Sequence, residues 1–393
     1  MSKPIPSATI NEHGLERVRA GHPWIYSSDL VRLQGEVAPG QAVAVRDPRG
    51  RRLGAADYSP NSKIALRLLT RDADQSFDEA FFRERIRAAV VYRDRVVHDT
   101  DACRLIWGEA DGLPGLVVDR YRDAISLQIL TWGMEARRDL LLRLLEEELK
   151  PAVIVERNDS RVRLLEGLEM RSGLLKGGSS QVEITLNGLH LAMDLLAGQK
   201  TGGFLDQREN WPSPLRYIPE GAEALDVFTY QGGFALHLAR RCRRVEAVDI
   251  SRDALEHADA NAQRNQLSNI DWIEANAFDL LRQYDDDGRR FDLVVLDPPA
   301  FAKTRSALAT AERGYKEINL RAMKILRPGG MLVTCSCSHH LSESRLLEIV
   351  ADAANDARRT ITVIERRTQS LDHPILLTVP ETYYLKCVLA FVR

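Results

Sequence analysis

Two side chains capable of chemistry stand at the ends of two apolar runs in the C-terminal half of the chain. Asp297 follows the run 291–296, and Cys337 lies just beyond the run 331–335. A short apolar run without polar alternation is typical of a parallel strand that is buried on both faces. Open α/β sheets bind ligands at the carboxyl ends of their strands. The spacing therefore predicts a carboxylate and a thiol at one crevice, where a thiolate can act as a nucleophile.

The turn after Asp297 is fixed by Pro298 and Pro299, because two prolines can neither continue a strand nor enter a helix interior. A plain Asp-Pro turn is common in loops. The motif alone therefore does not separate a ligand site from an ordinary turn, and the surrounding elements have to decide.

These elements alternate in type from residue 223 onward, as expected for a doubly wound parallel sheet of the α/β class. The predicted strands are 224–228, 245–249, 271–273, 291–296, 331–335, 361–365 and 385–392. The predicted helices are 233–241, 252–265, 306–326 and 343–357.

The residues at the carboxyl end of each strand indicate the ligand of this sheet. A glycine pair, Gly232 and Gly233, comes after the first strand without the G-x-G-x-x-G spacing of dinucleotide-binding proteins. Asp249 ends the second strand, where an acid can accept both ribose hydroxyls. The loop 198–210 lacks apolar periodicity, so it is either a linker or a segment ordered by a ligand. The candidate cofactor-binding residues are Gln199, Thr201, Phe204, Arg208, Asp226, Phe228, Tyr230, Gly232, Gly233, Asp249, Ile250, Ser251, Asn276, Ala277, Phe278 and Asp297.

The first half of the chain is predicted to contain two further domains. Residues 1–73 alternate like a small β domain, with a hairpin turn at 47–50 whose arginines either contact phosphates or are simply solvated. Residues 74–180 indicate an α+β domain. Residues 181–393 would then form the third domain, which begins with a hairpin at Asn187-Gly188.

Composition narrows the class of protein. The chain has 393 residues, a net charge of −2 and five cysteines, an odd number that argues against a disulfide framework. No apolar run reaches the roughly 20 residues of a membrane span, and the start of the chain lacks a signal peptide, so we expect a cytoplasmic protein. The run 335–340 has two Cys and two His, but its spacing does not match a structural zinc site, and no metal is expected.

Several motifs in this order resemble the bacterial PUA-containing methyltransferases that make 5-methylcytidine in large-subunit ribosomal RNA. The resemblance covers nearly the whole chain: residues 5–72 resemble the PUA module, and WGEADGLPGLVVDRY the central domain. GQKTGGFLDQREN, DVFTYQGGFAL, DPPAFAK and the SCS at 336–338 resemble the motifs of the Rossmann-like catalytic domain. The resemblance implies S-adenosylmethionine as cofactor and large-subunit ribosomal RNA as partner. The sequence leaves open whether the chain forms a homodimer.

The family's chemistry implies roles for the two side chains at the crevice. Addition of the Cys337 thiolate to carbon-6 of cytosine makes carbon-5 nucleophilic toward a sulfonium methyl group. Asp297 would hold the polar edge of the base. Many RNA cytosine carbon-5 methyltransferases use a second Cys for release of the product, but here Ala300 follows Pro299 and the sequence names no release base.

Two other functions are compatible with the same residues. An acid followed by two prolines and an aromatic residue is typical of enzymes that methylate an exocyclic amine of a base, although Phe301 comes one residue late for that motif. The other alternative is a non-catalytic RNA-binding assembly factor with a decayed cofactor site. Intact candidate residues at every strand end argue against decay.

Overall fold

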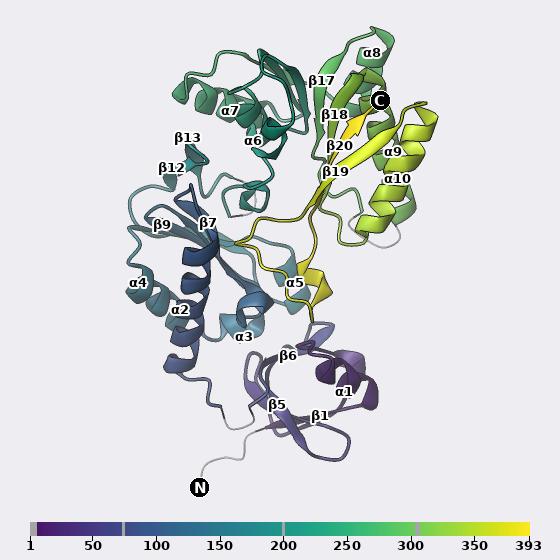
Figure 1. Cartoon of the computed structure of the whole chain (residues 1–393). Coiled ribbons are helices and arrows are strands. Elements are labelled where there is room, and N and C mark those ends of the chain that lie inside the picture. Colours follow the sequence, from purple (N-terminus) through teal and green to yellow (C-terminus); the bar gives the residue numbers. More distant parts are fainter. Residues whose placement is uncertain (1–5, 73–74, 199–200, 303–306) are drawn as a thin grey trace. The chain divides into compact units, whose positions relative to one another are not determined.

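The computed structural model describes residues 6–72, 75–198, 201–302 and 307–393, which form two compact units (Figure 1). The first unit contains the chain up to Thr185, together with Ala192–Leu205 and Leu371–Thr382. The second contains Leu186–Leu191, Asp206–Ser370 and Tyr383–Arg393. Both predicted N-terminal domains thus lie in the first unit, and the domain boundaries at residues 73 and 180 remain predictions.

The N-terminal part of the first unit is a six-stranded sheet with the strand order β2-β6-β5-β4-β1-β3. The predicted hairpin at 47–50 is confirmed, because β4 and β5 pair antiparallel and the Asp47 carboxylate accepts the N–H groups of Arg49 and Arg51 across the turn. The elements are β1 Ser7–Ile10, α1 Glu12–Arg19, β2 Trp24–Tyr26, β3 Leu30–Gln34, β4 Ala42–Arg46, β5 Arg52–Tyr58 and β6 Ile64–Thr70.

The remainder of the first unit is an α+β arrangement built on a five-stranded sheet of order β11-β10-β9-β8-β7. Apolar residues of α2 and α4 pack on this sheet in one buried cluster. The elements are α2 Glu79–Val96, β7 Ala102–Trp107, β8 Leu116–Tyr121, β9 Ala124–Ile129, α3 Trp132–Glu135, α4 Arg138–Leu149, β10 Val153–Asn158, α5 Val162–Glu166 and β11 Arg171–Lys176.

The predicted hairpin at Asn187-Gly188 is also confirmed: β12 (Gln181–Leu186) and β13 (Leu189–Asp194) form a two-stranded sheet. Asn187 and Gly188 have φ angles of 52° and 78°, the left-handed conformation that this kind of two-residue turn requires.

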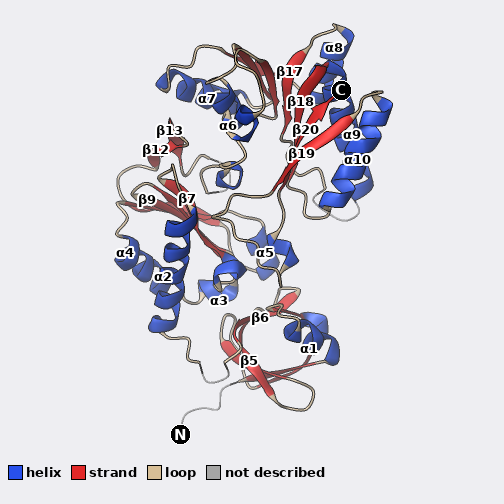
Figure 2. Cartoon of the chain, viewed as in Figure 1, coloured by secondary structure: helices blue, strands red, loops and turns tan. Residues whose placement is uncertain are grey.

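The second unit contains a seven-stranded sheet of order β16-β15-β14-β17-β18-β20-β19 (Figure 2). The predicted α/β fold is present, but the sheet is not wholly parallel: β20 runs antiparallel to both β18 and β19. The strands are β14 Glu223–Val227, β15 Arg244–Asp249, β16 Ile270–Glu274, β17 Phe291–Leu296, β18 Leu326–Ser336, β19 Ile361–Arg367 and β20 Lys386–Val392. The helices are α6 Gly233–Leu238, α7 Arg252–Arg264, α8 Ala277–Asp286, α9 Leu308–Ile325 and α10 Glu343–Asp356.

Strand β17 shows why this sheet is buried on both faces. Val294 and Leu296 pack into one apolar cluster with α8, α9 and α10, whereas Leu293 and Val295 pack into a second cluster with α6. Alternate residues of a strand point to opposite faces. A central strand between two helical layers must therefore be apolar on both faces, as residues 293–296 are.

Helix α8 is the main element that the sequence prediction lacked. It begins directly after Asn276, whose side-chain oxygen accepts the N–H groups of Phe278 and Asp279 as an N-cap. Strand β18 also differs, since it begins at Leu326 and includes the glycine pair 329–330 that the prediction treated as a stop. Within the described part of the chain, no helix is long and apolar enough to cross a bilayer.

Candidate functional site

The carboxyl ends of β14, β15 and β17 carry three of the predicted acids, Asp226, Asp249 and Asp297. Strands β15, β14, β17 and β18 are consecutive neighbours and run parallel, so these residues and Cys337 stand along one edge of the sheet. The topology thus brings together what the sequence distributes over more than 100 residues, between 226 and 337.

The loop after β14 has an unusual backbone. Phe228 and Tyr230 have φ angles of 67° and 50°. Bulky residues rarely adopt this left-handed conformation, and such strain clusters at binding and catalytic sites. The loop is held from below by Asp226, which is fully buried and accepts the Thr229 hydroxyl at 2.6 Å and the Ala235 N–H at 2.9 Å.

Burial, helped by the charge of Asp249, raises the pKa of Asp226 to about 7. The second carboxyl oxygen, Oδ1, is buried without a hydrogen-bond partner among the described residues. Asp226 therefore stabilises the loop 228–230 through hydrogen bonds from within the core. Its side chain is fully buried, so a ligand does not reach it in this structure.

The glycine pair after β14 lies against two tryptophan rings. Gly232 has a φ of 80°, and a Cβ placed on it would lie 2.9 Å from the Trp272 ring. A Cβ on Gly233 would lie 2.4 Å from the Trp211 ring. Both glycines are therefore required by tryptophans of the protein itself, and room for a ligand is not what their missing side chains provide.

Asp249 connects two loops of the crevice. Its Oδ2 accepts the Tyr230 N–H at 2.8 Å, and its Oδ1 accepts the Ser251 N–H at 3.0 Å. The side chain is half-buried, and each carboxylate oxygen has a second lone pair for an incoming hydroxyl. Next to it, Ile250 is 72% exposed, an apolar surface suited to a flat ring, while Ser251 caps α7.

Asn276 and Phe278 border the same edge. Asn276 is exposed and uses its oxygen to cap α8, so its amide nitrogen is the part directed to other partners. The Phe278 ring lies 6.0 Å from the Phe301 ring, which in turn lies 4.8 Å from the Tyr315 ring. Ala277 is buried in the first turn of the helix. The Phe301 ring is thus part of an aromatic cluster.

The loop 198–210 is divided. Gln199 lies outside the described residues. Thr201 and Phe204 belong to the first unit, where the fully buried Thr201 hydroxyl donates to Asp119. Arg208 belongs to the second unit, is 2% exposed and pairs with Glu209 at 3.0 Å. The predicted cofactor contacts of this loop remain predictions for all four residues, Gln199, Thr201, Phe204 and Arg208. Within the protein, Thr201 already bonds to Asp119, and Arg208 pairs with Glu209.

Gln207 is a residue of this loop that the sequence prediction missed. It is buried, and its Nε2 donates to Asp297 Oδ2 at 2.9 Å. Its own oxygen accepts from Asn210 at 2.7 Å, which fixes the orientation of the amide. The donated N–H therefore fixes the orientation of the Asp297 carboxylate.

Two cysteines flank this carboxylate region in different environments. Cys335 is fully buried, and burial, a hydrogen bond with Cys387 and the charge of Asp297 raise its pKa well above the usual range. Cys337 is half-buried, whereas the other four cysteines are buried. A nucleophile must be both reachable and ionisable. Cys337 meets the first condition and Cys335 meets neither.

The turn that carries Cys337 is anchored on both sides of the thiol. The Ser336 hydroxyl donates to the Tyr315 hydroxyl at 2.9 Å, and the Tyr315 and Ser338 hydroxyls lie 3.1 Å apart. The Lys386 ammonium donates to the Ser338 carbonyl at 2.7 Å. Neither Tyr315 nor Lys386 was expected from the sequence. The only sequence signal for Lys386 is a single charge at the start of an apolar run.

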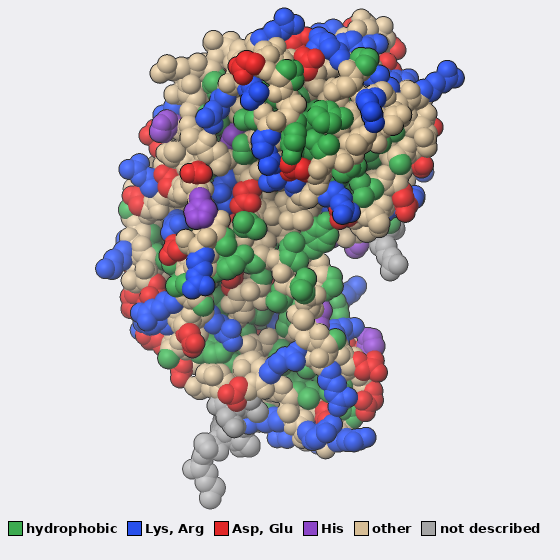
Figure 3. Space-filling model, viewed as in Figure 1, with side chains coloured by type: hydrophobic (Ala, Val, Ile, Leu, Met, Phe, Trp, Pro, Cys, Tyr) green, Lys and Arg blue, Asp and Glu red, His purple; other side chains and the backbone are tan. Residues whose placement is uncertain are grey.

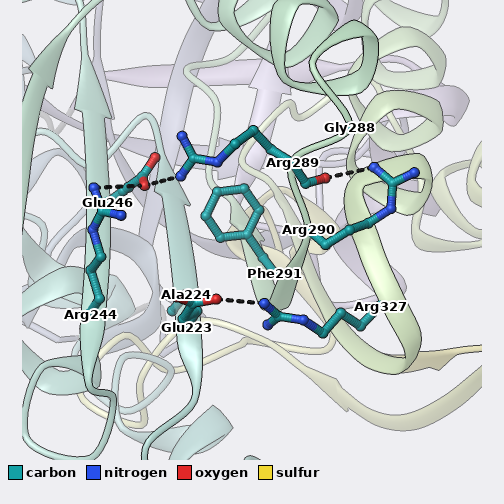
Figure 4. A pocket seen from close by; sticks show the side chains of 9 residues that line it. All are labelled: Glu223, Ala224, Arg244, Glu246, Gly288, Arg289, Arg290, Phe291 and Arg327. Carbon is teal, nitrogen blue, oxygen red and sulfur yellow. Dashed lines mark hydrogen bonds and ion pairs between the residues drawn. The ribbon is translucent and has the colours of Figure 1, made fainter.

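The opposite edge of the sheet holds a pocket of about 310 Å³ lined by the amino ends of the strands (Figure 4). Its arginines are largely committed to neighbouring acids. Arg327 contacts Glu223 at 2.5 Å, and both Arg244 and Arg289 contact Glu246. Charge at this edge is therefore neutralised within the protein, which makes the carboxyl edge the better candidate for the ligand site.

The carboxyl edge fits S-adenosylmethionine. Its adenosine moiety needs a carboxylate for the ribose diol and apolar surface for the ring, and Asp249, Ile250 and Phe278 would be the residues to hold it. Its amino-acid moiety needs polar groups, and the strained loop 228–230 follows β14 at the same edge of the sheet. The donor set thus matches the two halves of this cofactor.

Comparison with known proteins agrees with this assignment. A family model described as a PUA-like domain matches residues 8–71, and one described as an S-adenosylmethionine-dependent methyltransferase matches residues 166–378. The chain is 40% identical over 372 residues to ribosomal RNA large subunit methyltransferase I of Cronobacter sakazakii, covering 93% of this chain and 94% of the relative. It is 41% identical over 377 residues to the protein of that name from Aliivibrio fischeri, covering 94% and 95%.

Solved structures support the fold. The SMU.776 methyltransferase complexed with SAH superimposes with a TM-score of 0.84 at 18% identity, covering 98% of this chain and 99% of that one. A SAM-dependent methyltransferase from Streptococcus mutans gives a TM-score of 0.83 at 18% identity, covering 98% and 99%. The chain belongs to the S-adenosylmethionine-dependent methyltransferases that carry a PUA-like domain, the family of ribosomal RNA large subunit methyltransferase I.

Proposed function

We propose that this protein transfers a methyl group from S-adenosylmethionine to carbon-5 of a cytidine in large-subunit ribosomal RNA, through a covalent adduct with Cys337. The choice of RNA rests on the name of the relatives at 40% identity over nearly their whole length. The choice of carbon-5 rests on one observation: the reachable thiol of the chain stands at the same sheet edge as Asp297.

The thiol answers a chemical difficulty. Carbon-5 of cytosine is a weak nucleophile, and addition of the Cys337 thiolate to carbon-6 turns carbon-5 into an enamine-like carbon. The cofactor would supply an electrophilic methyl group bound to a sulfonium sulfur. Once carbon-5 carries the methyl group, loss of its proton to a base expels the Cys337 thiolate from carbon-6 and restores the ring. Asp297, fixed by Gln207, accepts a hydrogen bond from the exocyclic amine and so orients the ring over the thiol.

The base must leave its stack to reach this edge. RNA-binding proteins recognise mainly single-stranded or looped bases in this way. The PUA-like sheet would hold flanking RNA through its exposed arginines, and Figure 3 shows Lys and Arg side chains gathered on that part of the first unit. These exposed arginines include Arg32, Arg49, Arg51 and Arg52.

Methylation of an exocyclic amine is less well supported, for a specific reason. That chemistry usually needs an aromatic side chain after the prolines to stack on the base, but Phe301 already packs against Tyr315 and Phe278. It also needs no thiol, which would leave the anchored turn at 336–338 without a purpose. A non-catalytic role is disfavoured by the intact cofactor edge.

The test is the identity of the methylated nucleoside. Large-subunit ribosomal RNA that lacks the modification is incubated with the protein and isotope-labelled S-adenosylmethionine, then digested and analysed by mass spectrometry. We expect label in 5-methylcytidine. Label in N4-methylcytidine or in a methylated purine would replace the proposal with amine methylation, and bound cofactor without transfer would favour the assembly factor.

A further inference from the structure

Lys386 is a buried cation to which the proposed reaction assigns no task. It is the first residue of β20, is 3% exposed and pairs in register with Ser336, the residue before Cys337. Its ammonium donates to the carbonyl oxygens of Ser338 and Tyr384 at 2.7 and 2.8 Å. A buried ammonium is costly unless hydrogen bonds and an opposite charge compensate for lost water. Its position beside the Cys337 turn therefore needs an explanation.

Two groups act on the charge of Lys386: Cys337, which follows β18, and Glu343 of α10. Burial lowers the pKa of Lys386 to about 8, against the opposing influence of Cys337 and Glu343. Glu343, at the start of α10, also accepts the Tyr383 hydroxyl at 3.2 Å and lies 3.7 Å from Arg366. It is therefore shared among several partners.

Two further groups near the thiol, among the residues that the structure describes, are Tyr315 and His339. Tyr315 of α9 faces Cys337, and burial raises the pKa of its phenol, which stays neutral at physiological pH. His339 is exposed, with its ring 5.6 Å from that of Tyr384. Lys386 is the cation that bonds directly to the turn carrying Cys337, through the carbonyl of the next residue, Ser338.

We propose that Lys386 is a positioning residue that keeps Cys337 in the thiolate form and fixes the turn that carries it. An ammonium has three N–H donors. Two of them hold the Ser338 and Tyr384 carbonyls, and the proposal assigns the third to the Cys337 sulfur. The thiol proton is lost to solvent, and the ammonium keeps its own protons. The inference rests on the proposed function only in taking Cys337 as the nucleophile.

The experiment measures the thiolate directly, without RNA or cofactor. The full chain is treated with iodoacetamide between pH 5.5 and 9.5, and the Cys337 peptide is followed by mass spectrometry. The other four cysteines are at most 5% exposed, so they report unfolding if they react. An unperturbed thiol has an alkylation midpoint near pH 8.5. We expect the Cys337 midpoint of the natural protein to lie clearly below that.

Three substitutions separate charge from structure. Lys386→Met removes the charge and should raise the midpoint by about one pH unit, which slows alkylation about tenfold at pH 7. Lys386→Gln keeps N–H donors for the carbonyls but should shift the midpoint similarly. Lys386→Arg keeps the charge and should restore the midpoint toward the natural value. Lys316→Met removes a lysine of α9 that pairs with Asp356 of α10, and this control should leave the midpoint unchanged.

A natural midpoint at or above about pH 8.5 would overturn the inference even if every Lys386 variant failed to fold. An unchanged midpoint in folded Lys386→Gln would overturn it as well. Failure of the proposed function gives a different result: methyl transfer that survives in Cys337→Ala would remove the covalent route, while the alkylation midpoint would still report on Lys386.

Discussion

The two edges of the seven-stranded sheet both carry acidic side chains, but they satisfy them in different ways. At the amino edge, Glu223 and Glu246 form ion pairs with arginines around the pocket of Figure 4. At the carboxyl edge, Asp226 and Asp249 accept N–H groups of the loops and a hydroxyl, and Asp297 accepts an amide N–H. The acids of the amino edge are neutralised by arginine side chains, whereas those of the carboxyl edge are held by uncharged N–H and O–H donors.

This difference between the two edges indicates at which edge a ligand can bind. A carboxylate already paired with an arginine gains little by exchanging it for a ligand. A carboxylate held by uncharged N–H or O–H donors has no charged partner to displace and keeps a second lone pair on each bonded oxygen. The strained φ angles of Phe228 and Tyr230 occur at this second edge as well. Five substitutions test the contrast, beginning with the one of largest expected effect.

Cys337→Ala should abolish methyl transfer, with a loss of at least about a thousandfold, because the covalent route has no substitute nucleophile. RNA that contains 5-fluorocytidine gives a second readout. Its carbon-5 carries fluorine in place of the proton that must be removed before the thiol can leave, so the covalent adduct persists. The natural protein should form this adduct on a denaturing gel. Cys242→Ala, which removes a buried thiol in the cluster around α6, should still form it. An adduct in Cys337→Ala would contradict the assignment.

Asp249→Asn should weaken S-adenosylmethionine binding by about tenfold to a hundredfold, measured by calorimetry. The amide has one acceptor oxygen where the carboxylate has two, so its NH2 group must face the N–H of either Tyr230 or Ser251. An unmet buried bond of this kind costs about 1–3 kcal/mol. Glu223→Gln alters an acid at the amino edge and should leave the dissociation constant unchanged. Equal losses in both variants would erase the contrast.

Gln207→Ala should lower the turnover number about tenfold and leave cofactor affinity close to that of the natural protein. The substitution removes the donor that orients Asp297, a bond to a charged group worth about 1.5–3 kcal/mol. Gln207→Glu has the same shape but sets a second negative charge against Asp297, and it should be slower still. If Gln207→Ala instead weakened cofactor binding alone, Asp297 would belong to the cofactor site and not to the base.

Asp226→Asn should change how stability depends on pH. Asp226 titrates near 3.8 when unfolded and near 7 when folded. Between these values the folded state binds more protons, so the natural protein loses stability as pH rises through this window. The variant does not titrate there. Its unfolding free energy, relative to the natural protein, should therefore improve by about 1–3 kcal/mol from pH 5 to pH 8. A relative value that stays constant would mean that Asp226 is ionised when folded.

The sequence predicted the sheet and its carboxyl edge well. Each apolar run indicates a buried strand, and the acid near its end, Asp226, Asp249 or Asp297, marks the carboxyl edge. It did not predict α8, although Asn276 before Leu281 and Tyr284 at helical spacing indicates a capped helix. Asn276 was assigned to a ligand, and the cap shows that its oxygen has a structural task.

Two other residues were beyond prediction for a physical reason. Lys386 reaches the Cys337 turn only because β20 pairs antiparallel with β18, about 50 residues earlier in the chain. Gln207 meets Asp297 across 90 residues. Contacts of this kind depend on strand order, and a local pattern contains no information about it.

Arg290→Ala should have the smallest effect. Arg290 is exposed at the rim of the amino-edge pocket, where it donates to the Arg289 carbonyl at 2.7 Å. A surface substitution of this kind changes stability by no more than about 0.5 kcal/mol. Cofactor affinity and methyl transfer should equal those of the natural protein, and so should RNA affinity measured over a range of salt concentrations. A shallower salt dependence in the variant would show that this arginine contacts a phosphate. The amino edge would then have a ligand of its own, and neutrality would no longer distinguish it from the carboxyl edge.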